Sequence, residues 1–190
     1  MNNDKRSICL GRMYFPVKTL GPGNRVGIWT IGCNRNCKGC ISPELRDYDE
    51  SKKVTIEDIL EMINRIEAPI DGFTISGGEP FFDPVALRFL VESLRILNDD
   101  ILIFTGYTLE ELRARNDEDI DTILDICSAI VDGEYIEELN DSKGLRGSSN
   151  QKIHIINHFD KYKNIEYAER QLQAVVYDGR ILQIGIPRGK

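Results

Sequence analysis

The sequence has no run of apolar residues that approaches the roughly 20 needed for a membrane-spanning helix. Positive charge is also scarce, because 24 Lys and Arg residues face 31 Asp and Glu residues, and the net charge is -7. This balance argues against broad binding to nucleic acids or to anionic membranes. The opening residues, MNNDKRSICLGRMYF, contain no apolar signal segment, so we expect a cytoplasmic protein.

Internal repeats, low-complexity tracts and convincing linkers are absent as well. The length of 190 residues suits one domain with one core, so we expect a single domain over residues 1–190. Only five cysteines and two histidines could serve as soft metal ligands. In the cytoplasm, clustered cysteines are more often metal ligands or catalytic groups than parts of a disulfide framework.

Strand and helix patterns alternate along most of the chain. They predict strands at 26–31, 72–76, 101–105 and 129–133, and helices that begin at Thr55, Pro84, Thr108 and near Asp117. Such alternation indicates a parallel sheet covered by helices. Because a closed eight-unit barrel takes about 250 residues, we expect an α/β fold with a partial (β/α) barrel of about four to six units.

The C-terminal part, at about 152–187, is rich in strand-forming residues. The segment LQAVVYDGRILQIGI contains two such runs joined by Asp178 and Gly179, which predict a hairpin with a type I′ turn. The expected fold therefore combines a mostly parallel sheet with a C-terminal β-hairpin.

Polar or reactive loops follow all four predicted parallel strands. They are the cysteine loop, the GGEP turn, Thr105-Gly106 and Asp132-Gly133. Ligand sites in sheets of this kind gather where the carboxyl ends of the strands meet. We therefore expect an active site at this edge of the sheet.

Three of the five cysteines stand in TIGCNRNCKGCIS with the spacing C-x3-C-x2-C: Cys33, Cys37 and Cys40. Thiolates suit iron–sulfur clusters or zinc, and structural zinc usually takes four protein ligands. The candidates for a fourth ligand are Cys9, Cys127, His154 and His158. Cys127 is better explained as a core residue, and each histidine as a core or surface residue. Three local ligands favour a four-iron cluster with one open position, and a zinc knuckle is the alternative.

The segment SGGEP follows the second predicted parallel strand and includes Gly77, Gly78 and Glu79. Alone it reads as an ordinary turn. Paired glycines, however, let a ligand approach the backbone closely, and Glu79 adds a carboxylate that suits a cationic amino group. Together with the three-cysteine motif one strand earlier, the segment is much more specific than either part.

These two motifs resemble those of radical S-adenosylmethionine (SAM) enzymes. The lead-in GPGNRVGIWTIGC, at 21–33, is similar to that of glycyl-radical-enzyme activases. The segments IFTGYTLEEL, VDGEYIEEL and RGSSNQ resemble the family of anaerobic ribonucleoside-triphosphate reductase-activating proteins. The resemblance covers about 14–156, with a weaker similarity in GIP at 185–187.

The resemblance implies one [4Fe–4S] cluster, with Cys33, Cys37 and Cys40 on three irons and SAM on the fourth. It implies reductive cleavage of SAM to methionine and a 5′-deoxyadenosyl radical, which takes a hydrogen atom from a glycine of a partner protein. The implied partners are a glycyl-radical enzyme, with anaerobic ribonucleotide reductase the first expectation, and a flavodoxin- or ferredoxin-type electron donor. Neither a nucleic acid nor a membrane is expected as a partner.

The resemblance also implies that Gly77, Gly78 and Glu79 hold the amino group of SAM. Thr105 and Asp132, at the ends of later strands, are candidates by position for its ribose or carboxylate. The implied catalyst is the cluster with SAM, so no side chain is assigned as catalytic.

Two positions depart from the family pattern. Gly39 and Ile41 stand where relatives often carry an aromatic residue beside the third cysteine, which puts the usual packing of adenine in doubt. Two further interpretations remain open: a minimal radical SAM enzyme that acts on another glycyl-radical enzyme, a peptide or a small molecule, and a non-catalytic metal-binding module.

Overall fold

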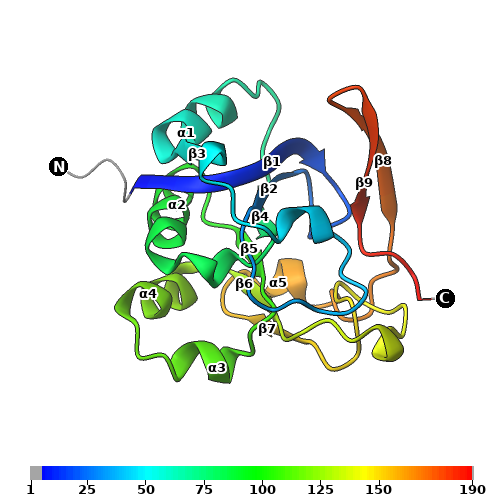
Figure 1. Cartoon of the computed structure of the whole chain (residues 1–190). Helices are drawn as coiled ribbons and strands as arrows, with labels where there is room; N and C mark the ends of the chain where they lie inside the picture. The colour runs from blue at the N-terminus through cyan, green and yellow to red at the C-terminus, as the bar shows by residue number, and fades with distance from the viewer. Residues whose placement is uncertain (1–5, 190) are drawn as a thin grey trace.

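The computed structural model describes residues 6–189, and its centre is a seven-stranded sheet (Figure 1). In spatial order the strands are β3 (Lys53–Thr55), β1 (Ser7–Val17), β2 (Arg25–Thr30), β4 (Gly72–Gly77), β5 (Ile101–Phe104), β6 (Ala129–Asp132) and β7 (Lys152–Ile155). The four inner strands, β2, β4, β5 and β6, pair in parallel. The outer strands join antiparallel, so the predicted α/β fold with a parallel, partial barrel is confirmed.

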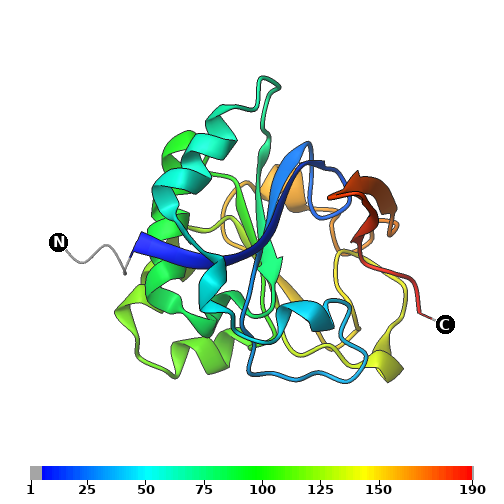
Figure 2. The same ribbon diagram turned by 45° about the horizontal axis from the view of Figure 1, so that its top comes forward.

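Helices α1 (Ile56–Asn64), α2 (Pro84–Leu97) and α4 (Glu118–Ile126) cover one face of this sheet (Figures 1 and 2). The short helix α3 (Leu109–Arg113) lies between β5 and α4 in the chain. On the covered face, one fully buried isoleucine from each inner strand stands beside the next: Ile28, Ile75, Ile103 and Ile130. Burying each such side chain contributes roughly 1.5–3 kcal/mol, so this row fixes the register of the inner strands.

The opposite face carries helix α5 (Phe159–Tyr162) and the hairpin of β8 (Leu172–Tyr177) and β9 (Arg180–Gly185). Figure 2 shows the red hairpin on the side of the sheet away from α1 and α2. Ile184 of the hairpin is buried in a cluster with Trp29 of β2. The hairpin strands pair only with each other in the described part of the chain, so side-chain packing holds them to the sheet.

Local sequence signals account for the helix starts. Thr55 caps α1 by accepting a hydrogen bond from the backbone N–H of Asp58 at 3.1 Å. Thr108, where a helix is predicted to begin, forms a capping box with Glu111 at the start of α3. The hairpin turn is confirmed too, because Asp178 and Gly179 both have positive φ, as a type I′ turn requires.

A buried charged cluster ties together the starts of the inner strands. The guanidinium of Arg25, the first residue of β2, lies 3.1 Å from the carboxylate of Asp100, and both side chains are fully buried. Arg25 also donates to the hydroxyl of Thr74 at 2.7 Å. Asp100 accepts further hydrogen bonds from Tyr162 and from Lys161 of α5, so the cluster joins the strand starts to this helix.

Strand β1 was not predicted from its sequence. Its eleven residues, SICLGRMYFPV, interrupt the apolar residues with a glycine, an arginine and a proline, and the strand contains register shifts against β2. No helix among residues 6–189 is long and apolar enough to cross a membrane. The single domain over 1–190 stays a prediction.

Candidate active site

One cavity of about 1030 Å³ lies at the carboxyl ends of the parallel strands. Its walls include residues from all four predicted loops: Cys33, Cys37, Cys40, Gly77, Gly78, Glu79, Thr105, Gly106 and Gly133. The opposite wall comes from β9 and the residues that follow it, up to Gly189. The loops that the sequence assigns to one edge of the sheet therefore do meet around one space.

The cysteine loop wraps around this cavity with all three thiols free and partly exposed. Arg46 shapes the loop from outside. Its guanidinium donates to the carbonyl of Cys37 and, at 3.0 Å, to the side chain of Asn36, while its carbonyl accepts from the N–H of Cys33 at 2.9 Å. Arg46 is thus a scaffold for the loop that the sequence motif does not reveal.

The donor set of this loop fits an iron–sulfur cluster. Three thiols line one cavity, and burial raises the pKa of the Cys37 thiol, while a hydrogen bond from the backbone of Tyr135 lowers it. Among residues 6–189 no three His, Cys, Asp or Glu side chains are grouped as a site for one metal ion. A cluster has its thiolates on different irons, so its ligands stand further apart than those of a single ion.

None of the four other candidate ligands lines the cavity. Cys127 is fully buried at the end of α4, and Cys9 is buried near the chain at Asp49. His154 bonds the carboxylate of Asp132 at 2.9 Å, and His158, the residue before α5, lies 3.1 Å from the carboxylate of Asp99. The predicted assignment of Cys127 and the two histidines to core or surface roles agrees with their positions.

The two glycines of GGEP allow the turn to dock on the chain that leads into the cysteine loop. Gly77 has a φ of +125°, and a Cβ there would overlap the backbone of Thr30. A Cβ on Gly78 would overlap the carbonyl oxygens of Gly32 and Leu45. The close approach that these glycines permit is therefore, in this structure, an approach of backbone to backbone.

Glu79 is 1% exposed, although its residue lines the cavity. Its carboxylate accepts hydrogen bonds from the hydroxyl of Thr105 and the N–H of Gly106, each at 2.7 Å, and from the N–H of Phe81 at 3.0 Å. Burial raises the pKa of Glu79, whereas these three bonds and the charge of Arg35 act in the opposite direction. Glu79 thus joins the GGEP turn to the end of β5.

The predicted positions Thr105 and Asp132 differ in their surroundings. Thr105 lines the cavity and directs its hydroxyl to Glu79. Asp132 does not line the cavity, and its carboxylate accepts from the backbone N–H groups of Leu109 at 2.7 Å and Lys152 at 3.1 Å. Its position at the end of a strand predicted that Asp132 faces the ligand site. In the structure its side chain points to neighbouring backbone groups instead.

Arg35 of the cysteine loop reaches across to the loops after β5 and β6. Its guanidinium stacks 4.7 Å from the ring centre of Tyr107 and lies 3.4 Å from Glu111 and 3.6 Å from Glu134. The hydroxyl of Tyr107 in turn donates to Asn34 at 2.7 Å. These contacts between distant segments hold the cysteine loop in place, and no local sequence pattern predicts them.

The two departures from the family pattern have structural counterparts. Gly39 has a φ of +74°, and a Cβ there would lie 3.1 Å from the carboxylate of Glu137, so a side chain at this position would be strained. Ile41 lines the cavity and is 61% exposed. The loop therefore favours glycine at one position and presents an aliphatic side chain at the other.

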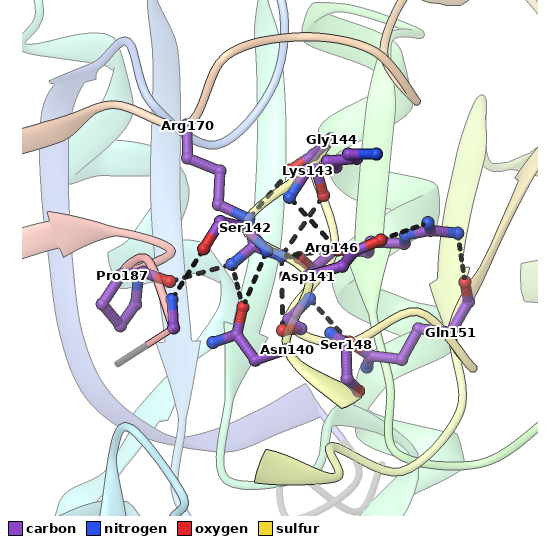
Figure 3. Close-up of polar contacts among 12 residues, drawn as sticks. Asn140, Asp141, Ser142, Lys143, Gly144, Arg146, Ser148, Gln151, Arg170 and Pro187 are labelled. Atoms are coloured by element: carbon purple, nitrogen blue, oxygen red, sulfur yellow. Dashed lines mark hydrogen bonds and ion pairs between the residues drawn. The ribbon is translucent and has the colours of Figure 1, made fainter. Parts of the chain in front are cut away.

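Two residues of the RGSSNQ segment, Gly147 and Gln151, line the same cavity. Figure 3 shows the polar contacts around this segment. The side-chain oxygen of Gln151 accepts from the N–H groups of Gly147 at 2.7 Å and Ser148 at 3.1 Å. Its amide nitrogen donates to the carbonyl of Gly133 at 2.7 Å. Gln151 thereby fastens the segment to the end of β6.

Comparison with known proteins identifies the family. A family model described as a 4Fe-4S single cluster domain matches residues 19–154. The anaerobic ribonucleoside-triphosphate reductase-activating protein of Escherichia coli (strain K12) is 32% identical over 151 residues, which cover 74% of this chain and 95% of that protein. The chain belongs to this family. The member from Enterobacteria phage T4 is 27% identical over 138 residues, covering 70% of this chain and 85% of its own.

Among solved structures, QueE from Escherichia coli matches with a TM-score of 0.48 and 19% identity, over 56% of this chain and 55% of that one. Membership of the activating-protein family confirms the resemblance recognised in the sequence. It also agrees with the prediction of an iron–sulfur cluster in place of zinc.

Proposed function

We propose that this chain is a radical SAM activase that cleaves SAM at a [4Fe–4S] cluster and takes a hydrogen atom from a glycine of anaerobic ribonucleoside-triphosphate reductase. One observation carries the proposal: three free thiols and the GGEP turn line the same cavity in a chain of the activating-protein family. When bound and reduced, the cluster supplies the electron for cleavage of SAM. The chain supplies binding, orientation and shielding.

Cys33, Cys37 and Cys40 would bind three irons and leave the fourth for SAM. Their loop is already braced by Arg35 and Arg46, so the thiols face the cavity before any cofactor arrives. Such bracing favours binding because fewer side chains and loops must be ordered at that moment.

Gly77, Gly78 and Glu79 would form the part of the cavity that receives the SAM amino group, with Thr105 beside them. The carboxylate of Glu79 is largely engaged by backbone and by Thr105, so its main role would be to fix the shape of this wall and to add negative charge near the amino group. We do not assign Asp132 to SAM, because its carboxylate serves the backbone around β6 and β7.

The remaining predicted partners complete the proposal. A flavodoxin- or ferredoxin-type protein would donate the electron, and the activity would take place in the cytoplasm. The cavity is bounded on one side by a sheet that does not close into a barrel, which suits a substrate presented on a loop of another protein.

The test is anaerobic reconstitution with iron and sulfide, followed by incubation with SAM, a reductant and the reductase. We expect about four irons per chain, in keeping with one four-iron cluster, together with methionine and 5′-deoxyadenosine as products and an EPR signal of a glycyl radical on the reductase. One bound zinc without iron–sulfur absorbance would contradict the proposal. SAM cleavage without a glycyl radical would move the activity to another substrate.

A further inference from the structure

The side chain of Arg170 is 2% exposed and forms the centre of a hydrogen-bond network beside the cavity (Figure 3). Its guanidinium donates to one side-chain oxygen and to several backbone carbonyls: Asn140, Lys143, Gly144, Arg146, Gly147 and Pro187. All three of its nitrogens donate. The only carboxylate near it is that of Asp141, at 3.6 Å among the described residues.

This arrangement depends on the shape of an arginine side chain. Burial lowers the pKa of Arg170, and the charge of Asp141 acts in the opposite direction. A guanidinium presents five N–H donors in a fixed plane, whereas a lysine has three donors at one point. A lysine at position 170 would therefore leave some of these carbonyls without a partner.

The network joins two segments that both line the cavity. Asn140 and Gly147 belong to the first, and Pro187 and Gly189 to the second. Arg170 bonds Asn140 at 2.6 Å and the carbonyl of Pro187 at 2.9 Å, so a single side chain reaches both. A second link runs from the N–H of Gly189 to the hydroxyl of Ser142 at 2.8 Å.

Arg170 also sets the orientation of the Asn140 amide. The side-chain oxygen of Asn140 accepts from Arg170 and, at 3.1 Å, from the N–H of Ser142. Its nitrogen has a longer contact of 3.4 Å to the hydroxyl of Tyr135. Because Asn140 lines the cavity, this orientation makes its N–H₂ group the donor available to an oxygen of a bound ligand.

The second segment lies outside the part of the chain that the family model describes. That model ends at residue 154, whereas Arg170 and Pro187 come later. The relative from Escherichia coli is covered over 95% of its own length but matches only 74% of this chain. The C-terminal wall of the cavity thus lies beyond the residues that the family model matches, and Arg170 attaches it to them.

We infer that Arg170 is a positioning residue that fixes this C-terminal wall, together with Asn140, in the arrangement that binds SAM. The inference rests on the proposed function for its ligand. Without Arg170 the two segments separate more often, and the apparent affinity for SAM falls in proportion to the fraction of chains with the wall in place.

The experiment compares the reconstituted wild type with Arg170→Lys and Arg170→Gln. We expect the dissociation constant for SAM, measured by equilibrium dialysis, to rise by about tenfold or more, with iron content unchanged. Hydrogen exchange of the chain before reconstitution should become faster at residues 140–151 and 185–189. Arg25→Lys is the matched control, since it alters a buried arginine at the other end of the sheet and should leave both measurements unchanged.

Ser142→Ala removes the second link without touching the guanidinium and serves if the Arg170 variants do not fold. It should accelerate exchange near Gly189 and weaken SAM binding by about two- to threefold. Unchanged exchange and unchanged SAM affinity in the soluble variants would overturn the inference while leaving the proposed function intact. A wild type that binds a cluster but no SAM would instead refute the proposed function.

Discussion

Two buried arginines, Arg25 and Arg170, join different kinds of segment. Arg25 is paired with the carboxylate of Asp100 and joins strands that are held together anyway by backbone ladders and by a core of isoleucines. Arg170 is surrounded mainly by carbonyls of loops that have no regular structure of their own. The first region supplies stability, and the second supplies the shape of a ligand site.

The comparison extends to the two ends of the inner strands. At their amino ends, polar groups satisfy one another in a fully buried cluster. At their carboxyl ends, thiols, glycines and backbone groups surround an open space. Changes at the first end should alter folding free energy, and changes at the second should alter cofactor and SAM binding.

The largest expected effect is at the cysteine loop. Cys37→Ala should abolish cluster binding and SAM cleavage, because this loop has only three thiols and the cluster needs all of them. Cys33→Ala and Cys40→Ala should do the same. Iron and sulfide content after anaerobic reconstitution measures the effect. Cys9→Ala and Cys127→Ala are the controls and should retain the cluster. Full activity in any of the first three variants would refute the assignment.

The second effect is on stability at the other end of the sheet. Burial alone would raise the pKa of Asp100, but Arg25, Tyr162 and Lys161 outweigh it and hold the pKa below its ordinary value of 3.8. A lowered pKa stabilises the fold above pH 3.8, and this contribution is lost as the pH falls through the folded-state value. Asp100→Asn should therefore cost about 3 kcal/mol at pH 7.

Urea unfolding at several pH values measures this loss. The gap in unfolding free energy between wild type and Asp100→Asn should narrow as the pH is lowered below the ordinary value for an aspartate. A gap that is the same at acidic and neutral pH would show that the charge of Asp100 is not what stabilises the fold. Cluster binding by the variant should be normal when it is folded.

The third expected effect is on both the stability of the fold and the binding of SAM. Glu79→Gln removes a buried charge but sets an amide N–H₂ group against one of the backbone N–H donors from Phe81 or Gly106. We expect a loss of about 2 kcal/mol in unfolding free energy, together with weaker SAM binding. Glu92→Gln, on the surface of α2, is the control and should change neither. Unaltered SAM affinity would remove Glu79 from the site.

The smallest effect is expected at Asp132. Asp132→Asn keeps one side-chain oxygen and replaces the other by an N–H₂ group, so either Leu109 or Lys152 loses its acceptor and the stability should fall by about 1 kcal/mol. SAM affinity, measured by equilibrium dialysis, should stay the same because Asp132 does not line the cavity. A loss of about tenfold in affinity with normal stability would return Asp132 to the site.

Most of the regular structure could be predicted because its signals are local. Helices α2 and α3 begin where their patterns predict, and the Asp178-Gly179 turn is present as expected. Strand β1 escaped prediction because its partners β2 and β3, and not its own composition, make it a strand. Local periodicity cannot report such pairing.

The sequence predicted some residues of the candidate site and missed others. The three cysteines and GGEP were singled out because their spacing is typical of motifs with a known chemistry, and all of them except Pro80 line one cavity in the structure. Arg46 and Arg170 were missed, since each acts on backbone groups that are distant in sequence and leaves no motif. Asp132 shows the converse: its position at a strand end was right, but the direction of its side chain depends on neighbours that only the folded chain brings near.

The separation of the β8–β9 hairpin from the seven-stranded sheet has a consequence for the cavity. No backbone ladder crosses between the two in the described part of the chain, so the hairpin can lengthen, shorten or change sequence without disturbing the hydrogen bonds of the inner strands. One side of the cavity can therefore change its shape while the strands that carry the cysteine loop and the GGEP turn keep their pairing.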